Sequence, residues 1–292
     1  MKEYKIGYSS DEHLDFYCFE KNTQAPKFKR QIKNYIEKFK GKDAGGDILL
    51  CGGDTSHYDD QTKEYLTQMN ELYTHVFIVS GNHDLYLVSD KQQRKYSKNS
   101  INRVNEMKEW CDNQTNIHYL DGNVVNIDGL KIGGLGNWYN LDTLGKIASW
   151  NEIMNDSNLI MEGAEPIRFQ YGYGASHKES QWDTQAHRKT QEDAMKRIQE
   201  EKCDILLTHI IPTIIPDEFL FHGHHGESAN IFYMSDDIEE VKKTGAEIVV
   251  YGHNHEVRKW DYEGIEWKTN AVGYPQEYTG FEGIQHFYFI KE

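Results

Sequence analysis

Short apolar runs recur along this chain, and each one ends in glycine, serine, threonine or aspartate. They are rich in β-branched residues and short, so they predict buried strands. We predict such strands at Ile6–Tyr8, Ile48–Cys51, Val76–Val79, Ile205–Leu207 and Ile248–Tyr251. Between the first three, apolar residues at helical spacing predict helices over Phe28–Phe39 and Lys63–Tyr73. This β-α-β-α-β order indicates a mostly parallel sheet.

The second half of the chain mixes helices with hairpins. Helical spacing predicts helices over Arg188–Glu201 and Asp236–Lys243. Two hairpins, Val124–Gly134 and Val257–Lys268, turn at Asp-Gly and Glu-Gly pairs, and Gln285–Ile290 alternates like a strand. Strands at both ends of the chain with helices between them indicate two stacked sheets. We therefore expect an α/β fold, a four-layer αββα sandwich of two mixed β-sheets flanked by helices.

The chain shows no repeat, low-complexity tract or linker that would divide it, so residues 1–292 are expected to form a single domain. The region Trp138–Trp182 differs from the rest, because aromatic residues lie among many Gly, Asn and Ser with weak periodicity. It is longer than an ordinary loop. We expect a partly helical insertion at about 138–182 that packs over or beside the functional site.

The composition is that of a folded protein that does not favour anionic partners. Aromatic residues make up 13%, and 32 basic residues against 47 acidic ones give a net charge of −15. Such a field opposes loose association with nucleic acid or an anionic membrane. We find no apolar stretch long enough for a membrane span, no secretory signal and no CxxC pair among the four cysteines. A cytoplasmic protein is expected.

Polar residues of a recurring kind follow the predicted strands. In chain order these motifs are Asp11-Glu12-His13, Gly53-Asp54, Gly81-Asn82-His83-Asp84, Thr208-His209 and Gly252-His253-Asn254-His255. They supply two aspartates, one asparagine and four histidines that could converge as ligands, plus one further histidine for proton transfer. Because ligands collect at the carboxyl ends of parallel strands, we expect these side chains to meet at one edge of the sheets.

The donor types indicate which metals such a site would take. Carboxylate oxygens combined with imidazole nitrogens suit transition metals better than Ca²⁺ or Mg²⁺. Cysteines are absent from the motifs, which argues against a structural zinc site. We expect two divalent transition-metal ions, with Mn²⁺ as the first candidate and Fe, Zn, Co or Ni as alternatives.

The ordered motifs, from Asp11 to the Gly273-Tyr274-Pro275 segment, resemble the calcineurin-like metallophosphoesterase superfamily. The resemblance implies that one metal is held by residues from the two ends of the chain, Asp11, His13 and His255. It implies that the other metal is held by Asn82, His209 and His253. Asp54 would bridge the two ions, His83 would act beside the leaving group, and Asp84 would orient its loop.

The resemblance also implies a reaction, the hydrolysis of a phosphate mono- or diester by attack of a metal-bridging hydroxide. Two cations about 3.5–4 Å apart can clamp the attacking and leaving oxygens, and they lower the pKa of a bridging water toward about 7. The neutral Asn82 amide leaves net positive charge for a phosphate to neutralise. His83 can hydrogen-bond a phosphoryl oxygen or protonate the departing alkoxide.

One position departs from the pattern of many phosphatases of the superfamily. They have an aspartate three residues after the bridging aspartate, and it pairs with the catalytic histidine. Here that position is His57, as in Mre11-like nucleases, and we consider His57 a candidate substrate-binding residue. Asp59 or Asp60 could replace the missing aspartate only if the loop bends suitably.

Two further residues are candidate substrate contacts. Trp138 follows the Gly-rich segment Gly133–Asn137 and could form a stacking wall, with a core aromatic as the alternative. In small bacterial and phage-type members of the superfamily, a similar Leu-Trp segment precedes a Met-Asn-Asp helix, which Met154-Asn155-Asp156 resembles. His224, in the loop Phe221–Gly226, could line the pocket or bind phosphate, with a surface loop as the alternative.

Three functions are in competition. The first is a phosphoesterase that acts on a small or protein-borne phosphate ester. The second is an Mre11-like metal-dependent nuclease, which His57 and the basic segment Lys91–Arg103 favour and the net charge of −15 disfavours. The third is a catalytically silent binding scaffold, which the complete ligand set argues against. We expect no membrane partner, and the sequence predicts no particular oligomeric state.

Overall fold

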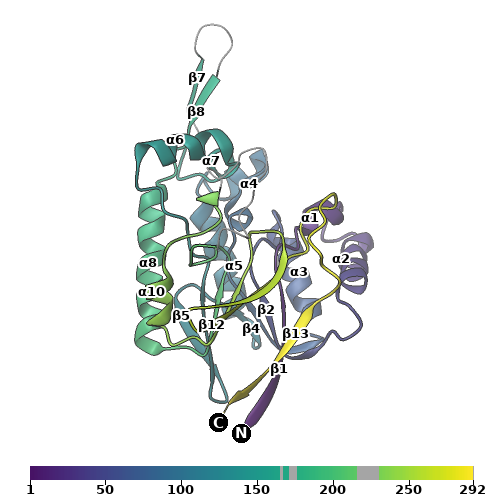
Figure 1. Cartoon of the computed structure of the whole chain (residues 1–292). Coiled ribbons are helices and arrows are strands. Elements are labelled where there is room, and N and C mark those ends of the chain that lie inside the picture. Colours follow the sequence, from purple (N-terminus) through teal and green to yellow (C-terminus); the bar gives the residue numbers. More distant parts are fainter. Residues whose placement is uncertain (165–166, 171–175, 216–229, 292) are drawn as a thin grey trace.

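The computed structural model describes residues 1–164, 167–170, 176–215 and 230–291, and its two large sheets pack face to face (Figure 1). The first sheet has the strand order β13-β1-β2-β3-β4. Its strands span Gln285–Lys291 (β13), Lys2–Ser9 (β1), Gly46–Cys51 (β2), Tyr73–Ile78 (β3) and Ile117–Tyr119 (β4). β1 to β4 are parallel and β13 is antiparallel to β1, so the sheet is mixed.

The second sheet has the strand order β11-β12-β10-β9-β6-β5. Its strands span Val257–Tyr262 (β11), Ile265–Asn270 (β12), Ile248–Tyr251 (β10), Ile205–Thr208 (β9), Leu130–Leu135 (β6) and Asn123–Ile127 (β5). The two outer strands are antiparallel to their neighbours, and the inner four are parallel. Both predicted hairpins are confirmed. Their turns, Asp128-Gly129 and Glu263-Gly264, have the positive φ at both residues that a two-residue type I′ turn requires.

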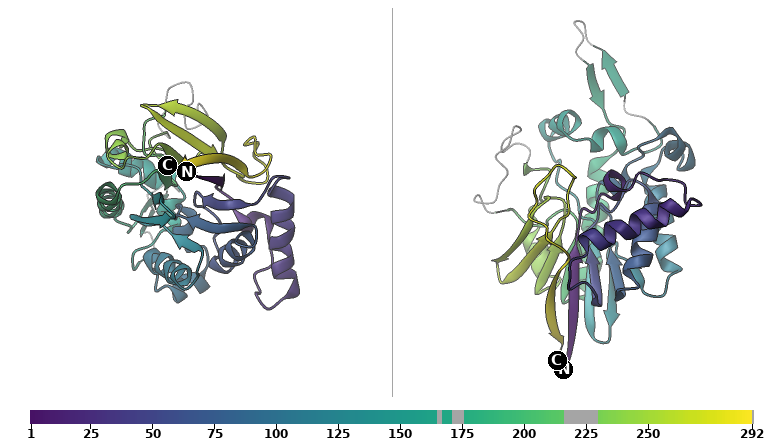
Figure 2. Two further views of the ribbon diagram at one scale, coloured as in Figure 1. Left: turned by 90° about the horizontal axis from the view of Figure 1, so that it is seen from below. Right: turned by 90° about the vertical axis from the view of Figure 1, so that its right-hand side faces the viewer.

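Helices cover the outer faces of both sheets. On the first sheet lie α2 (Pro26–Phe39), α3 (Asp59–Met69) and α5 (Ser100–Asp112). On the second sheet lie α8 (Thr184–Glu201) and α10 (Ile238–Lys242). Figure 2 shows the sheets between these two groups of helices, which confirms the predicted αββα sandwich. None of the helices in the described part of the chain has the length and apolar character of a membrane span.

The central strands are buried on both faces, which explains their continuous apolar sequences. In β2, Ile48 and Leu50 point into the core between the sheets, whereas Leu49 points toward the helices of the first sheet. In β9, Leu207 faces the same central core and Leu206 packs beneath α8. Full burial of one such side chain contributes about 1.5–3 kcal/mol to stability. This packing fixes the strand ends and therefore the starting points of the loops that follow.

Some boundaries differ from the predicted ones. The helix expected over Lys63–Tyr73 is α3, which starts at Asp59 and ends at Met69. It ends earlier because Tyr73 is the first residue of β3, where its side chain is buried in the core. The short elements α1 (Leu14–Tyr17), η1 (His83–Leu85) and α4 (Asp90–Lys95) have no sequence prediction, because one or two turns show no helical period.

The segment 138–182 contains α6 (Leu144–Ile153), α7 (Asp156–Leu159) and a hairpin of β7 (Ile167–Gln170) with β8 (Ser176–Glu179). The hairpin projects beyond α6, at the end of the molecule opposite the two termini (Figure 1). The helices pack against the loop after β3 through a cluster that includes Tyr86, Trp150 and Ile160. This contact places Asp156 beside the loop that carries Asn82.

Candidate metal centre

The predicted ligands lie in loops that follow five parallel strands. Asp11 and His13 follow β1, Asp54 follows β2, Asn82 follows β3, His209 follows β9, and His253 and His255 follow β10. The two sheets meet closely at this edge. A Cβ added to Gly252 would stand 2.7 Å from the carbonyl oxygen of Gly52 and 3.0 Å from Oδ2 of Asp11. Glycine at this position lets the motifs of the two sheets share one site.

Five of the predicted ligands have a backbone conformation that residues other than glycine rarely adopt. They are Asp11 (φ 54°), His13 (φ 42°), Asp54 (φ 56°), His253 (φ 70°) and His255 (φ 47°). Each such residue costs about 1–3 kcal/mol and persists only where its surroundings hold it, as functional sites often do. Backbone hydrogen bonds hold two of these residues in place. Asp11 N donates to Gly53 O (3.0 Å), and His13 N donates to Asp54 O (3.1 Å).

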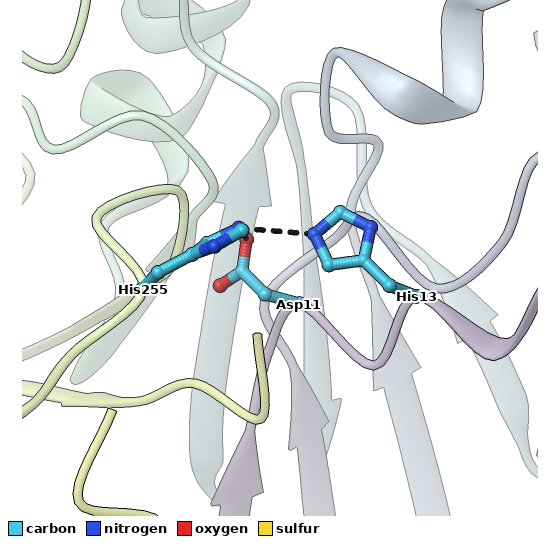
Figure 3. A group of neighbouring side chains, drawn as sticks. All are labelled: Asp11, His13 and His255. Atoms are coloured by element: carbon cyan, nitrogen blue, oxygen red, sulfur yellow. Dashed lines mark hydrogen bonds and ion pairs between the residues drawn. The ribbon is translucent and has the colours of Figure 1, made fainter. Parts of the chain in front are cut away.

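One group of side chains joins the two ends of the chain. The ligand atoms of Asp11, His13 and His255 all lie within 4.8 Å of one another. Figure 3 shows the three side chains pointing toward one another, with Nε2 of His13 3.0 Å from Nε2 of His255. The second of these atoms lies 3.5 Å from Oδ1 of Asp11. This arrangement offers two nitrogens and one oxygen to a single cation.

A second group lies deeper in the protein and contains Asp54, His209 and His253. Nε2 of His209 lies 3.5 Å from Oδ2 of Asp54, 3.2 Å from Nδ1 of His253 and 3.1 Å from Oδ1 of Asn82. All four side chains are buried. Asp54 also belongs to a third group with His13 and His83. Its carboxylate is therefore shared between the two halves of the site.

In each of His209, His253 and His255, one ring nitrogen points into the site and the other, the outer nitrogen, points away from it. The contact of the outer nitrogen determines which of the two carries the hydrogen. Nδ1 of His209 lies 2.7 Å from the carbonyl oxygen of Gly52, and Nε2 of His253 lies 2.9 Å from that of Phe232. Nδ1 of His255 lies 2.6 Å from Oε2 of Glu277. Each outer nitrogen faces an acceptor and so carries the hydrogen. Each inner nitrogen therefore presents a lone pair, which is the form that binds a metal.

The residues of the second group are suited to hold a cation. The inner nitrogens of His209 and His253 face an amide oxygen and a carboxylate, so four acceptors converge without a donor. Such a cluster needs positive charge at its centre. Burial opposes protonation of His209, but the nearby Asp54 and Asp11 outweigh it and raise its pKa to about 9. The site therefore attracts positive charge to the position that a divalent ion would take.

Burial and charge act differently on the other groups. Burial raises the pKa of Asp11, against the opposing effect of His255 and His209. For Asp54, burial also raises the pKa, but His209 and His83 outweigh it and hold it well below its usual value. Burial lowers the pKa of His253 to about 3 and that of His83 to about 4. Asp54 is thus a carboxylate, and both of these imidazoles are neutral.

The amide of Asn82 is oriented by a residue of the segment 138–182. Its Nδ2 donates to Oδ1 of Asp156 (2.9 Å) and lies 3.2 Å from the hydroxyl of Tyr86, which leaves Oδ1 pointing to His209. Asp156 is fully buried and also accepts hydrogen bonds from the hydroxyls of Tyr86 and Tyr139. The sequence motif Met154-Asn155-Asp156 predicts a helix but no contact of Asp156. Only its tertiary contact reveals that it fixes a candidate ligand.

His83 is contacted by His57 on the side away from the ligand groups, and His57 is contacted in turn by Asp15. Nδ1 of His83 lies 2.7 Å from Nε2 of His57, and Nδ1 of His57 lies 2.8 Å from Oδ2 of Asp15. Asp15 also accepts a hydrogen bond from the backbone N of His57 at 3.0 Å. Both ring nitrogens of His57 are thus engaged, and Nε2 of His83 faces Asp54 at 3.9 Å. Asp15 escaped sequence reasoning, because an acidic residue just after a ligand is too common a signal.

The suggested substitutes for the missing aspartate do not reach His57. Oδ1 of Asp59 pairs with Nε of Arg103 at 2.7 Å, and its Oδ2 accepts from Tyr96, while Asp60 is exposed. Asp84 behaves as expected, since its Oδ2 accepts from the backbone N of Asp54 (2.9 Å) and of Gly81 (2.8 Å). The predicted loop-orienting role of Asp84 is confirmed.

The remaining candidate contacts lie elsewhere. Trp138 is 2% exposed, belongs to the cluster that packs the insertion, and its ring contacts Tyr139 and His187. This placement corresponds to the core-aromatic alternative. His224 and its loop lie outside the described residues. In the basic segment, Arg103 is 1% exposed and donates to the backbone oxygens of His83, Tyr86 and Ser56.

Comparison with known proteins adds an independent result. A family model described as calcineurin-like phosphoesterase matches residues 4–257. An uncharacterized protein of Acanthamoeba polyphaga mimivirus is 23% identical over 237 residues, which is 80% of each chain. The solved structure of the phosphopantetheinyl hydrolase PptH from Mycobacterium tuberculosis aligns with 97% of this chain and 95% of its own, at 16% identity and a TM-score of 0.60. A dimetal phosphatase from Danio rerio aligns with 98% of this chain and 91% of its own, at 10% identity and a TM-score of 0.40.

The family match and the geometry lead to the same class of protein. The matched span covers all five motifs, and the structural likeness to the mycobacterial hydrolase concerns the fold. Members of this family use two divalent metal ions, and the clusters of His and Asp described above provide positions for them. This chain belongs to the calcineurin-like phosphoesterase family and is a metal-dependent hydrolase of phosphate esters.

Proposed function

We propose that the protein hydrolyses a phosphate mono- or diester at a centre of two divalent metal ions. The observation that carries this proposal is the position of Asp54, whose carboxylate belongs to two of the ligand groups at once. It is grouped with His13 and His83 on one side and with His209 and His253 on the other. A shared carboxylate lets two cations stand close enough to act on one phosphoryl group.

The ligand assignment follows the two groups. For one ion we propose Asp11, His13 and His255. For the other we propose Asn82, His209 and His253. Asp54 would contact both. Mn²⁺ is the proposed native ion, because oxygen and imidazole donors in these proportions suit it, and Fe, Zn, Co and Ni are the alternatives to test.

When bound, the two ions would supply Lewis-acid charge for the phosphoryl oxygens and lower the pKa of water toward neutrality. The chain sets the charge balance around them. Asp11 and Asp54 contribute two negative charges against the four positive charges of two divalent ions, and Asn82 contributes none. The surplus positive charge favours an anionic phosphoryl group at this edge of the sheets.

The proposed role of His83 is to assist the leaving group. Its Nδ1 is engaged by His57, so its Nε2 is the atom that faces the ligand groups. A departing alkoxide needs a hydrogen bond or a proton, and an imidazole is the side chain best suited to provide either near neutral pH. Asp15 and His57 would hold the ring in the orientation that this role requires, with Nε2 toward the ligand groups.

The substrate we propose is a small or protein-borne phosphate ester rather than nucleic acid. The net charge of −15 opposes binding to a polyanion. In the basic segment that favoured a nuclease, Arg103 is buried against Asp59, and Lys95 pairs with Glu106 at 2.7 Å. The name of the mycobacterial structure adds phosphopantetheinyl esters to the substrates worth testing.

The experiment is a substrate panel with metal-reconstituted protein. With Mn²⁺, the protein should hydrolyse p-nitrophenyl phosphate or bis-p-nitrophenyl phosphate, and the variant Asp54→Ala should abolish the activity. Asp60→Ala is the matched control, because Asp60 is an exposed aspartate outside the site. Absence of hydrolysis across monoesters, diesters, cyclic nucleotides and phosphopantetheinyl esters, with each of the five metals, would contradict the proposal.

A further inference from the structure

Tyr274 is half-buried beside the candidate metal centre and contacts His13 and His255 from the two ends of the chain. Its hydroxyl is 3.1 Å from Nε2 of His83, the one ring nitrogen of His83 that faces the site. Its ring centroid lies 4.4 Å from that of His13 and 4.8 Å from that of His255. The family resemblance and the ligand motifs assign Tyr274 no role. Its position, however, puts a hydroxyl group beside the atom proposed to meet the leaving group.

The backbone around Tyr274 is fastened at several points. Gly273 N donates to Asp11 O at 3.0 Å, and the hydroxyl of Tyr17 donates to Gly273 O at 2.9 Å. Tyr274 N donates to Oε2 of Glu277 at 2.9 Å, and the same oxygen lies 2.6 Å from Nδ1 of His255. One carboxylate therefore positions a candidate metal ligand and Tyr274 together. These bonds fix the backbone that carries the ring.

The hydroxyl of Tyr274 can act as a donor throughout the neutral pH range. A phenol ordinarily loses its proton only near about pH 10, so the hydroxyl keeps its proton at neutral pH. In the described structure the hydroxyl oxygen lies within hydrogen-bond distance of Nε2 of His83. Rotation about the C–O bond is enough to turn the hydrogen toward an oxygen that arrives at the same place, because a hydroxyl hydrogen is free to rotate.

Among the described residues, few charged donors other than the candidate metal ligands lie close to Asp11 and Asp54. Within the described residues, the ion-pair partners of Asp11 and Asp54 are histidines: His255 for Asp11, and His83 and His209 for Asp54. The guanidinium of the nearby Arg103 donates its hydrogen bonds to Asp59 and to backbone oxygens. A phosphate oxygen has several lone pairs and accepts more than one hydrogen bond. A neutral donor next to His83 therefore fits this position.

We infer that Tyr274 is a catalytic residue that contacts the substrate, its hydroxyl donating a hydrogen bond to a phosphoryl oxygen once the ester occupies the space in front of His83. This inference rests on the proposed function, because it takes the phosphoryl group to lie between the ligand groups and His83. The hydroxyl hydrogen turns toward the phosphoryl oxygen, and the oxygen of Tyr274 stays beside His83. No covalent bond is formed or broken at Tyr274.

The test compares Tyr274→Phe with Tyr278→Phe. The first variant removes only the hydroxyl and keeps the ring against His13. The second removes the hydroxyl of a tyrosine on the same segment that is 99% exposed. Three quantities are measured: kcat and KM of the Mn²⁺-loaded enzyme with p-nitrophenyl phosphate and its bis ester, the Kd of inorganic phosphate by calorimetry with Zn²⁺-loaded protein, and the metal content with Tm.

For Tyr274→Phe we expect kcat/KM to fall about tenfold to hundredfold, the effect of one hydrogen bond to a charged group. The Kd of phosphate should rise about tenfold, while metal content and Tm stay at the wild-type values. Tyr278→Phe should match the wild type in every measurement. A Tyr274→Phe variant with wild-type kcat/KM and phosphate affinity would overturn the inference, and so would one that loses metal, because Tyr274 would then be a structural residue.

The same measurements separate this inference from the proposed function. A wild-type protein that hydrolyses no ester would contradict the proposed function. The phosphate titration would still decide the contact, because it needs the metals and Tyr274 but no turnover. An active wild type with equal phosphate affinity and equal kcat/KM in Tyr274→Phe would leave the proposed function standing and remove only the role of Tyr274.

Discussion

Nδ1 of His83 lies 2.7 Å from Nε2 of His57, and the two imidazole rings are stacked with only 7° between their planes. On the far side of His57, its Nδ1 lies 2.8 Å from Oδ2 of Asp15. The three side chains form a line that ends at the candidate centre. His57 therefore lies between Asp15 and His83, in place of the direct aspartate–histidine pair expected from the family resemblance.

Replacing Asp15 tests whether this line supports His83. The variant Asp15→Asn removes the negative charge that holds His57 but keeps the size of the side chain, so we expect kcat to fall about tenfold to hundredfold with a smaller change in KM. Alkyl phosphates should lose more activity than p-nitrophenyl phosphate, because their leaving groups depend more on a proton from His83. Steady-state kinetics on both substrates, with Asp60→Asn as control, measures this. Equal losses on the two substrates would contradict a leaving-group role.

Asp156 offers a prediction about metal affinity. The variant Asp156→Asn should weaken binding of the ion next to Asn82 about tenfold to hundredfold. One of the two oxygens that accept from Asn82, Tyr86 and Tyr139 becomes an NH₂ donor, which disturbs the hydrogen bonds that orient the Asn82 amide. Calorimetric titration of the metal-free protein with Mn²⁺ measures the affinity. Asp142→Asn is the control, since Asp142 belongs to the same insertion and is exposed. Unchanged Mn²⁺ affinity in Asp156→Asn would show that Asn82 needs no such support.

Much of the fold could be predicted, because buried strands and tight turns require particular residue types. Strands such as β2 are covered on both faces and so read as unbroken apolar runs, and the hairpin at Glu263-Gly264 is marked by its turn residues. Helix boundaries were harder to predict. The end of α3 at Met69 depends on Tyr73 entering β3, which is a matter of tertiary packing rather than of local pattern.

The site also has a part that the sequence predicts and a part that it does not. Predicted ligands such as Asp11 and His255 follow strand ends in recognisable motifs, and the structure brings them together. The residues that support them were missed, because Asp15, Glu277 and Tyr274 act through contacts between distant segments. No local spacing distinguishes Glu277 from the other exposed acids of the chain. Its role is visible only where its carboxylate meets Nδ1 of His255.

Gly81 is expected to tolerate no side chain. A Cβ at this position would stand 2.0 Å from Oδ1 of Asp54 and 2.7 Å from the backbone N of the same residue. Gly81→Ala should therefore displace the shared carboxylate and weaken Mn²⁺ binding by about tenfold or more. Gly145→Ala is the control, because the nearest atom to its added Cβ is 4.0 Å away. A Gly81→Ala variant with wild-type Mn²⁺ affinity would mean that Asp54 does not ligate the metals.

His187 predicts acid sensitivity away from the metal centre. It lies between Trp138 and Trp182, and burial lowers its pKa to about 4. The value in the unfolded chain is about 6.5, so between these pH values the unfolded state binds more protons. The stability that the neutral ring provides is therefore complete above pH 6.5 and is lost as the pH falls toward 4.

The matching variant is His187→Phe, which keeps an aromatic ring in place but cannot bind a proton. From pH 7 to pH 5, the free energy of unfolding of the wild type should fall about 2 kcal/mol more than that of the variant. Urea unfolding of both metal-free proteins at the two pH values measures the difference, and the absence of metal removes acid release of ions from the comparison. Parallel pH dependence in the two proteins would show that His187 is not the sensitive group.

The proposed function depends on one carboxylate, that of Asp54, contacting two metal ions. The most direct measurement is anomalous X-ray scattering from crystals of the protein grown with Mn²⁺. The account predicts two strong peaks about 3.5–4 Å apart, one beside Asp11, His13 and His255 and the other beside Asn82, His209 and His253, with Asp54 between them. A single peak, or two peaks with the Asp54 carboxylate bound to neither, would contradict it.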